Sequence, residues 1–319
     1  MSGWVLEAGI NFIFIGKMEL LNCFKEYVEQ FQQLSFRDFS DIYNSLYQSY
    51  QHMQDKVEFS LLIDKANPFD LRFGLFKINN PQKIFSLLKK TGYEHPSLER
   101  IINFAAEFTP EFAAGFDFNI KSPKAKTYFL RLPDNKEFRK NPNEKIIGLG
   151  ELIDIDLKNI NTVELDGCYL IAIDFHKTNK ESIKIYSREE KVDFNKIRDC
   201  LKKNEINSQH LGIFQELFSE GGLKDTTISK KYSAEKQDNQ KNMLSGLSVF
   251  FELNDSLNLA VEKLVEMCVP EKSTEFKRTI QKLGDEHQIR YSHIGITFSR
   301  EKEPNESVLL YFSTLAKGS

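Results

Sequence analysis

Residues 112–132 read FAAGFDFNIKSPKAKTYFLRL. Two apolar-rich runs flank the polar turn SPKA, a pattern that predicts a β-hairpin. In the second run Lys126 and Tyr128 stand two residues apart, and residues i and i+2 of a strand face the same side. If that side is the interior of a barrel, the ammonium needs an anion, because an unpaired buried charge is costly.

The same Lys-x-Tyr pattern recurs on two further predicted strands. Each copy points an ammonium and a phenol the same way. Lysines gathered beside a wall of tyrosines form a good receptor for a diphosphate attached to a group that becomes cationic. The further copies are Lys184-Ile185-Tyr186 and Lys230-Lys231-Tyr232.

Four more strand pairs are predicted along the chain, most of them separated by helix. The expected unit is helix, strand, strand, helix (αββα), and about ten antiparallel strands can close into a barrel with helices as an outer ring. A TIM barrel needs single strands alternating with helices and is disfavoured. The other strand pairs are 57–64 with 69–78, 168–176 with 182–187, 226–233 with 243–253, and 291–299 with 307–314. Helices are predicted at 18–34, 36–54, 81–91, 96–108, 193–218, 255–267 and 272–284, and residues 134–150 are predicted to form a loop.

Length and composition fit a globular protein of one large domain or two small ones. The prediction is a single domain over residues 18–319, with residues 1–17 as an extension or an extra strand. The net charge of -3 argues against a nucleic-acid partner, which would need a clear basic excess. The apolar stretch at 4–15 is too short to span a bilayer, and no positive charge precedes Lys17, so no membrane or targeting segment is predicted. The four cysteines lack paired short spacing, which indicates reduced thiols and a cytoplasmic protein.

The αββα order with Lys-x-Tyr pairs resembles the ABBA prenyltransferases, also called the PT-barrel family. This family includes fungal indole, bacterial aromatic and cyanobactin peptide prenyltransferases. The resemblance covers about residues 40–314. Residues 57–73, VEFSLLIDKANPFDLRF, look like the family's first hairpin, and Tyr311 looks like its closing-strand tyrosine.

The resemblance implies an enzyme that transfers a prenyl group from dimethylallyl or geranyl diphosphate to an electron-rich aromatic acceptor, such as an indole or phenol. Allylic diphosphate ionises, tyrosine faces shield the carbocation, the aromatic ring attacks, and a base removes a proton. Carried over by position, Glu58 is the catalytic base. The diphosphate would be bound by Arg72, Lys126, Lys184 and Lys230, and the shield would be formed by Tyr128, Tyr186, Tyr232 and Tyr311.

Three departures from the family pattern bear on the phosphate site. Arg72 stands where naphthalene-type members have an Asp that belongs to a magnesium site, and no DDxxD motif occurs, so no metal ligands are predicted and Mg²⁺ is expected to be at most stimulatory. Ser307 replaces a lysine found in some members. An arginine of the fourth hairpin falls near Leu244 or Ser245.

The residues alone leave simpler interpretations open. Glu58 shares its face with Ser60 and Leu62, and the face of Arg72 is mixed, as a ligand cavity or a solvated surface would be. A peptide prenyltransferase is the alternative within the fold. A noncatalytic binding barrel, with tyrosines as core and lysines at the rim, is the alternative of another class. The protein is expected to be a monomer or a weak dimer.

Overall fold

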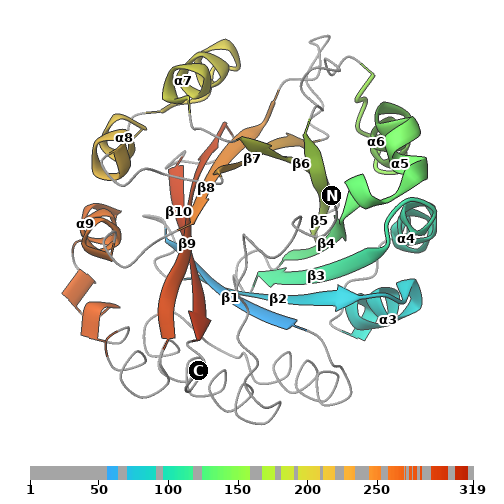
Figure 1. Ribbon diagram of the computed structural model, residues 1–319, viewed down its shortest axis with the longest axis horizontal. Helices are drawn as coiled ribbons and strands as arrows, with labels where there is room; N and C mark the ends of the chain where they lie inside the picture. The colour runs from blue at the N-terminus through green and yellow to red at the C-terminus, as the bar shows by residue number, and fades with distance from the viewer. Residues whose placement is uncertain are drawn as a thin grey trace.

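The computed structural model shows a closed barrel of ten strands, in the order β1-β10-β9-β8-β7-β6-β5-β4-β3-β2 (Figure 1). Each neighbouring pair is antiparallel, and β1 closes the barrel by pairing with β10. The prediction of about ten antiparallel strands in a barrel is therefore confirmed. The structure describes residues 56–63, 70–90, 96–117, 124–158, 167–176, 181–189, 193–208, 211–219, 226–233, 244–252, 258–268, 270, 273–274, 276–278, 281, 289–300 and 306–314.

The strands form five consecutive hairpins, which lie close to the predicted ranges. Their bounds are β1 Lys56–Ile63, β2 Asp70–Ile78, β3 Glu111–Asp117, β4 Lys124–Leu130, β5 Cys168–His176, β6 Ser182–Glu189, β7 Thr226–Ser233, β8 Gly246–Glu252, β9 Ile289–Ser299 and β10 Glu306–Thr314. The helices predicted at 18–34 and 36–54, and the extension at 1–17, lie outside the described residues.

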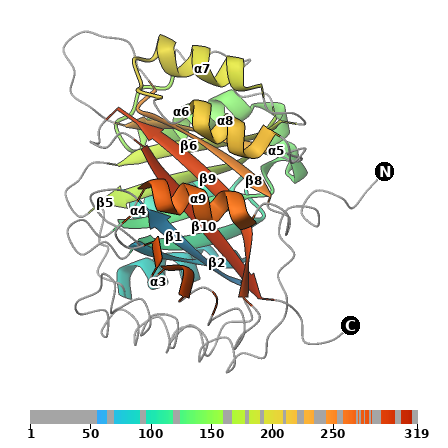
Figure 2. The ribbon, with the colours of Figure 1, turned by 90° about the vertical axis from the view of Figure 1, so that its left-hand side faces the viewer.

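Helices surround the barrel on its outside (Figures 1 and 2). In both views α9 lies beside β9 and β10. The α-helices with described bounds are α3 Pro81–Lys90, α4 Leu98–Ala106, α5 Lys136–Lys140, α6 Pro142–Glu151, α7 Phe194–Lys203, α8 Leu211–Ser219 and α9 Asn258–Cys268. Of the helix predicted at 272–284, the described helical residues are 273–274, 276–278 and 281.

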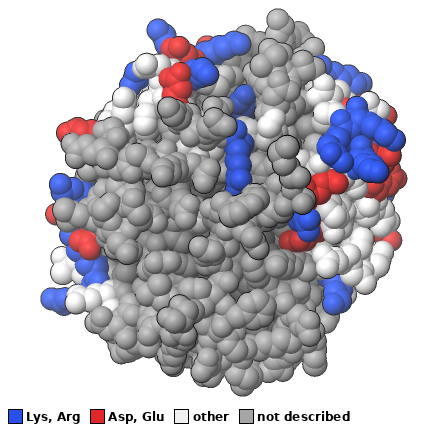
Figure 3. Space-filling model, viewed as in Figure 1, with Lys and Arg blue, Asp and Glu red and all other residues white. Residues whose placement is uncertain are grey.

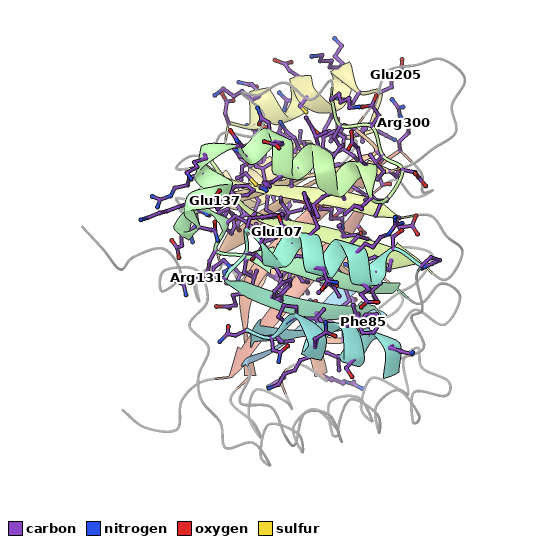
Figure 4. The ribbon with its side chains drawn as sticks, turned by 90° about the vertical axis from the view of Figure 1, so that its right-hand side faces the viewer. Phe85, Glu107, Arg131, Glu137, Glu205 and Arg300 are labelled. Atoms are coloured by element: carbon purple, nitrogen blue, oxygen red, sulfur yellow. The ribbon has the colours of Figure 1, made fainter. Side chains whose placement is uncertain are left out.

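The core lies between the outer face of the barrel and the helices. One row of cross-strand partners on this face runs from Phe129 through Ile171 to Ile185, and all three side chains are buried. The largest fully buried side chains of the described residues are phenylalanines, and Phe85 of α3 packs against the same layer (Figure 4). Phenylalanine is therefore mainly a core residue here, and burying each such side chain stabilises the fold by about 1.5–3 kcal/mol.

The prediction of a loop at 134–150 is wrong, because η1 (Leu132–Asp134), α5 and α6 fill this segment. Asn135 caps α5 by accepting hydrogen bonds from the backbone N–H groups of Glu137 and Phe138, at 2.8 and 3.2 Å. Pro142 begins α6, where the missing N–H breaks no helical bond.

Gly148 of α6 lies very close to α4. A Cβ on Gly148 would lie 2.6 Å from the ring of Phe104 on α4. The glycine therefore lets the two helices pack closely.

Arg300, which follows β9, connects this strand to the segment just after α7. Its Nη2 donates to the carbonyl oxygen of Asn204 and lies 3.8 Å from Glu205 Oε2, just after α7 (Figure 4). In the part of the chain that the structure describes, no helix is long and apolar enough to cross a membrane.

Candidate functional site

The inner face of the barrel carries a second, chemically different set of residues. The row of partners next to the apolar one runs from Tyr128 through Ala172 to Lys184 and Lys231. Directly opposed residues of antiparallel strands share a face, and consecutive residues of one strand point to opposite faces. Because the neighbouring apolar row faces the helices, this row faces the lumen of the barrel. The strands thus alternate between a core side and a polar, aromatic interior.

Basic side chains from four strands act on one another in this interior. Arg72 of β2 and Lys126 of β4 influence each other electrostatically, and both act on Lys184 of β6 together with Lys231 of β7. The side chains of Lys126 and Lys184 are only 17% and 15% exposed. This cation cluster (Arg72, Lys126, Lys184 and Lys231) is a site suited to a multiply charged anion.

Asp174 of β5 lies between the two central lysines. Its Oδ1 is 3.1 Å from Lys126 Nζ and its Oδ2 is 3.4 Å from Lys184 Nζ. The hydroxyl of Ser182 donates a hydrogen bond to Oδ2 at 3.2 Å. The carboxylate therefore partly compensates two of the four cations.

The two lysines respond differently to this environment. Burial is the largest single effect and lowers the pKa of Lys126, but the electrostatic effects of Asp174 and Tyr128 and the hydrogen bond with Asp174 together outweigh it, and the net pKa is raised. Burial lowers the pKa of Lys184 well below its usual value, and Lys126, Lys231 and Arg72 act in the same direction against the opposing effect of Asp174. Lys126 therefore holds its proton more strongly than Lys184 does.

An aromatic belt lies beside the cation cluster and consists of Tyr128, Tyr186, Phe250, Tyr311 and His293. Successive ring centroids are 6.5, 6.1, 6.1 and 6.3 Å apart. The ammonium of Lys126 lies 5.5 Å from the ring centre of Tyr128, which joins the two features. Burial raises the pKa of Tyr186 well above its usual value, so its phenol stays neutral.

Two glycines make room for this belt. A Cβ on Gly115 would lie 3.1 Å from the ring of Tyr128, and a Cβ on Gly295 would lie 2.5 Å from the ring of Phe250. Both glycines sit on strands next to the ring they accommodate, at inner-face register positions. Side chains at these positions would push the rings out of place.

The inward orientation predicted for Lys230 and Tyr232 is wrong. Lys230 pairs with Ile185 and Leu247 in the apolar outer row, and Tyr232 is 5% exposed within the core between barrel and helices. The neighbouring Lys231 takes the inner position instead. Two consecutive lysines place one cation on each face, so the pattern KKY does not by itself fix the parity of β7.

The strand pairing gives the position of Glu58 in the barrel. It pairs with Gly74, which pairs with Gly115, which pairs with Lys126, so the four residues follow one row of partners. Ser307 pairs with Thr297, whose hydroxyl lies 2.8 Å from that of Ser248. The position without the family's lysine is thus in a hydroxyl-lined part of the lumen.

Sequence reasoning missed Asp174, Lys231 and Phe250. Each stands at the inner parity of its strand, so alternation alone marks them as candidates once the strand register is known. Asp174 carries a signal of its own, because it is a carboxylate within the otherwise apolar run CYLIAIDFH. A charged residue there requires a partner.

Basic side chains are visible near the middle of the face seen in Figure 3, while acidic and basic side chains mix around its rim.

Among the described residues, no three His, Cys, Asp or Glu side chains are grouped so as to hold a metal ion. Burial raises the pKa of Cys168 to about 12, so this thiol is a core residue and not a nucleophile.

No family model and no curated protein sequence matches the chain. Among solved structures, 5-dimethylallyl tryptophan synthase from Streptomyces coelicolor, in complex with DMASPP and Trp, matches with a TM-score of 0.64 and 11% identity, over 94% of this chain and 96% of that chain.

Two further solved structures match over similar lengths. AnaPT from Neosartorya fischeri has a TM-score of 0.66 and 13% identity, over 97% of both chains. 6-Dimethylallyltryptophan synthase from Micromonospora olivasterospora, also in complex with DMASPP and Trp, has a TM-score of 0.65 and 14% identity, over 92% of this chain and 97% of that chain. The chain therefore has the fold of the ABBA, or PT-barrel, aromatic prenyltransferases.

Proposed function

We propose that this protein is an aromatic prenyltransferase, which transfers a prenyl group from dimethylallyl or geranyl diphosphate to an indole or phenol. The observation that carries the proposal is the cation cluster directly beside the aromatic belt inside the barrel. An allylic diphosphate has an anionic end and a carbon end that becomes cationic on ionisation. The two features match these two ends.

The proposed roles follow from this arrangement. Arg72, Lys126, Lys184 and Lys231 bind the diphosphate, with Lys231 in the role first assigned to Lys230. When the allylic C–O bond breaks, its electron pair leaves with the diphosphate, whose developing charge the cations stabilise.

The aromatic belt acts on the other product of this ionisation. The faces of Tyr128, Tyr186 and Tyr311 stabilise the allylic cation by about 0.5–2 kcal/mol per contact. Phe250 lies between Tyr186 and Tyr311 and completes this wall. A wall of ring faces also excludes water, which would otherwise capture the cation.

The final steps concern the acceptor. Its π electrons form the new C–C bond to the allylic carbon, and the ring proton is then lost to a base. Glu58 is proposed for this base, because it follows the same row of partners as Lys126. The solved structures in complex with DMASPP and Trp support a diphosphate donor and an aromatic acceptor for this barrel.

The test is incubation with dimethylallyl and geranyl diphosphates against indole, phenol and Trp-containing peptide acceptors, read by mass. Prenylated small aromatics support the proposal, and prenylated peptides would favour the alternative peptide prenyltransferase. A barrel that binds allylic diphosphate without consuming it with any acceptor would be a noncatalytic binding barrel.

A further inference from the structure

Asp174 stands at the centre of the cation cluster without a role in the proposed chemistry. It is 5% exposed, and each of its two carboxylate oxygens faces a different lysine. Ser182 fixes one of these oxygens. Asp174 is therefore a buried carboxylate held in a fixed position inside the proposed diphosphate site.

The contacts of Asp174 leave the lysines able to bind a second anion. An ammonium has three N–H donors. Lys126 and Lys184 each direct one toward Asp174, so further donors remain for phosphate oxygens. A diphosphate held by these lysines would lie within a few ångströms of the Asp174 carboxylate, and like charges at such distance repel in a partly dehydrated site.

This repulsion does not act equally on substrate and product. The allylic diphosphate has one oxygen blocked by its ester bond, whereas the released diphosphate has that oxygen free and anionic. A fixed carboxylate therefore disfavours the product more than the substrate.

We propose that Asp174 is a resident counter-ion of the cation cluster, a positioning residue that holds Lys126 and Lys184 in place and promotes release of diphosphate after prenyl transfer. The inference rests on the proposed function. It also accounts for the opposite behaviour of the two lysines, because one carboxylate compensates two ammonium groups and Lys126 lies closer to it.

The experiment compares wild type with Asp174→Asn by calorimetric titration of inorganic pyrophosphate. Asparagine keeps the shape and one acceptor oxygen but removes the charge. We expect Asp174→Asn to bind pyrophosphate about tenfold more tightly or better, since a juxtaposed like charge is removed. Asp174→Glu, which keeps the charge, should stay close to wild type.

Steady-state kinetics give a second readout that a purely structural role would not produce. Slow product release lowers kcat of Asp174→Asn, while kcat/KM for the allylic diphosphate does not fall. Pyrophosphate should also become a stronger product inhibitor. Glu137→Gln is the matched control, because Glu137 forms an exposed ion pair with Lys140 on α5, 2.8 Å apart, outside the barrel (Figure 4).

A second pair of variants guards against failure of Asp174→Asn to fold. Lys184→Met and the double variant Asp174→Asn/Lys184→Met differ by the same carboxylate, and the double variant keeps the buried charges balanced. Tighter pyrophosphate binding by the double variant than by Lys184→Met supports the proposal. Equal or weaker binding in either comparison overturns it and makes Asp174 only an organiser of the lysines. If wild type binds no pyrophosphate at all, the proposed function itself fails.

Discussion

Lys126 and Tyr128 stand two residues apart on β4, and the ammonium of the first lies 5.5 Å from the ring centre of the second. One strand thus presents a buried ammonium and an aromatic ring side by side. Lys184 and Tyr186 repeat the two-residue spacing on β6, and the rings of Tyr128 and Tyr186 lie 6.5 Å apart. The boundary between the cation cluster and the aromatic belt is where the allylic C–O bond is proposed to break.

Replacing Lys126 or Lys184 by Met should raise the KM for the allylic diphosphate and lower kcat. Each variant loses charge-assisted contacts worth about 1.5–3 kcal/mol, which corresponds to about tenfold to a hundredfold. The measurement is steady-state kinetics with varied allylic diphosphate. Lys140→Met, on the exposed surface of α5, is the control and should behave as wild type. Unchanged kinetics in both inner variants would remove these lysines from the phosphate site.

Glu58→Gln should fold normally and turn over slowly. Gln keeps the size of Glu and can hydrogen-bond the acceptor, but it cannot take up a proton at neutral pH. Loss of a general base typically costs about 10²–10⁴ in rate. The measurement is turnover at saturating diphosphate and acceptor, together with the melting temperature. Near-full activity in a folded variant would place the base elsewhere, for instance on the departing diphosphate.

Removing divalent metal with EDTA should leave detectable activity. Arg72 and the three lysines of the cluster supply positive charge of the kind that a magnesium ion would otherwise bring to a bound diphosphate. Product formation with EDTA, and with EDTA followed by excess Mg²⁺, measures this directly. A complete loss that Mg²⁺ reverses would contradict the expectation.

Binding of pyrophosphate at a pH above the lowered pKa of Lys184 should be coupled to proton uptake by this lysine. The pKa of Lys184 is lowered by burial and by Lys126, Lys231 and Arg72, against the attraction of Asp174. A bound anion favours the charged ammonium and so raises this pKa, which means that affinity falls as the pH rises through the lowered pKa.

Proton uptake is measured by titrating pyrophosphate in two buffers with different heats of ionisation. Wild type should show uptake, and Lys184→Met should show much less. Equal proton exchange in both proteins would contradict the assignment of a lowered pKa to Lys184 in the empty barrel.

The sequence was sufficient for the architecture because each hairpin carries its own local signals. The turn SPKA and the apolar runs on either side of it predict β3 and β4 without any knowledge of the rest of the chain. Local signals failed at Pro142 and Gly148, which are typical of loops but here begin a helix and permit close helix packing. Only the tertiary contact with Phe104 explains that glycine.

The site was less predictable, because it depends on strand register. Lys126 and Tyr128 lie on the face that alternation suggested once a barrel was assumed. Alternation within β7 gave no choice between Lys230 and Lys231, since pairing with β6 decides the face. Asp174 is recognised as a partner of Lys126 only when β4 and β5 are aligned.

The most direct test of the account uses the two adjacent lysines of β7. Lys231 is in the lumen opposite Lys184, whereas Lys230 pairs with Ile185 and Leu247 on the outer face. Binding of dimethylallyl S-thiolodiphosphate is measured for Lys231→Met and Lys230→Met, each checked for folding. The account predicts that Lys231→Met weakens binding about tenfold or more, while Lys230→Met leaves it unchanged. Equal effects, or loss of binding in Lys230→Met alone, would contradict the assignment of the diphosphate site to the inner face of the barrel.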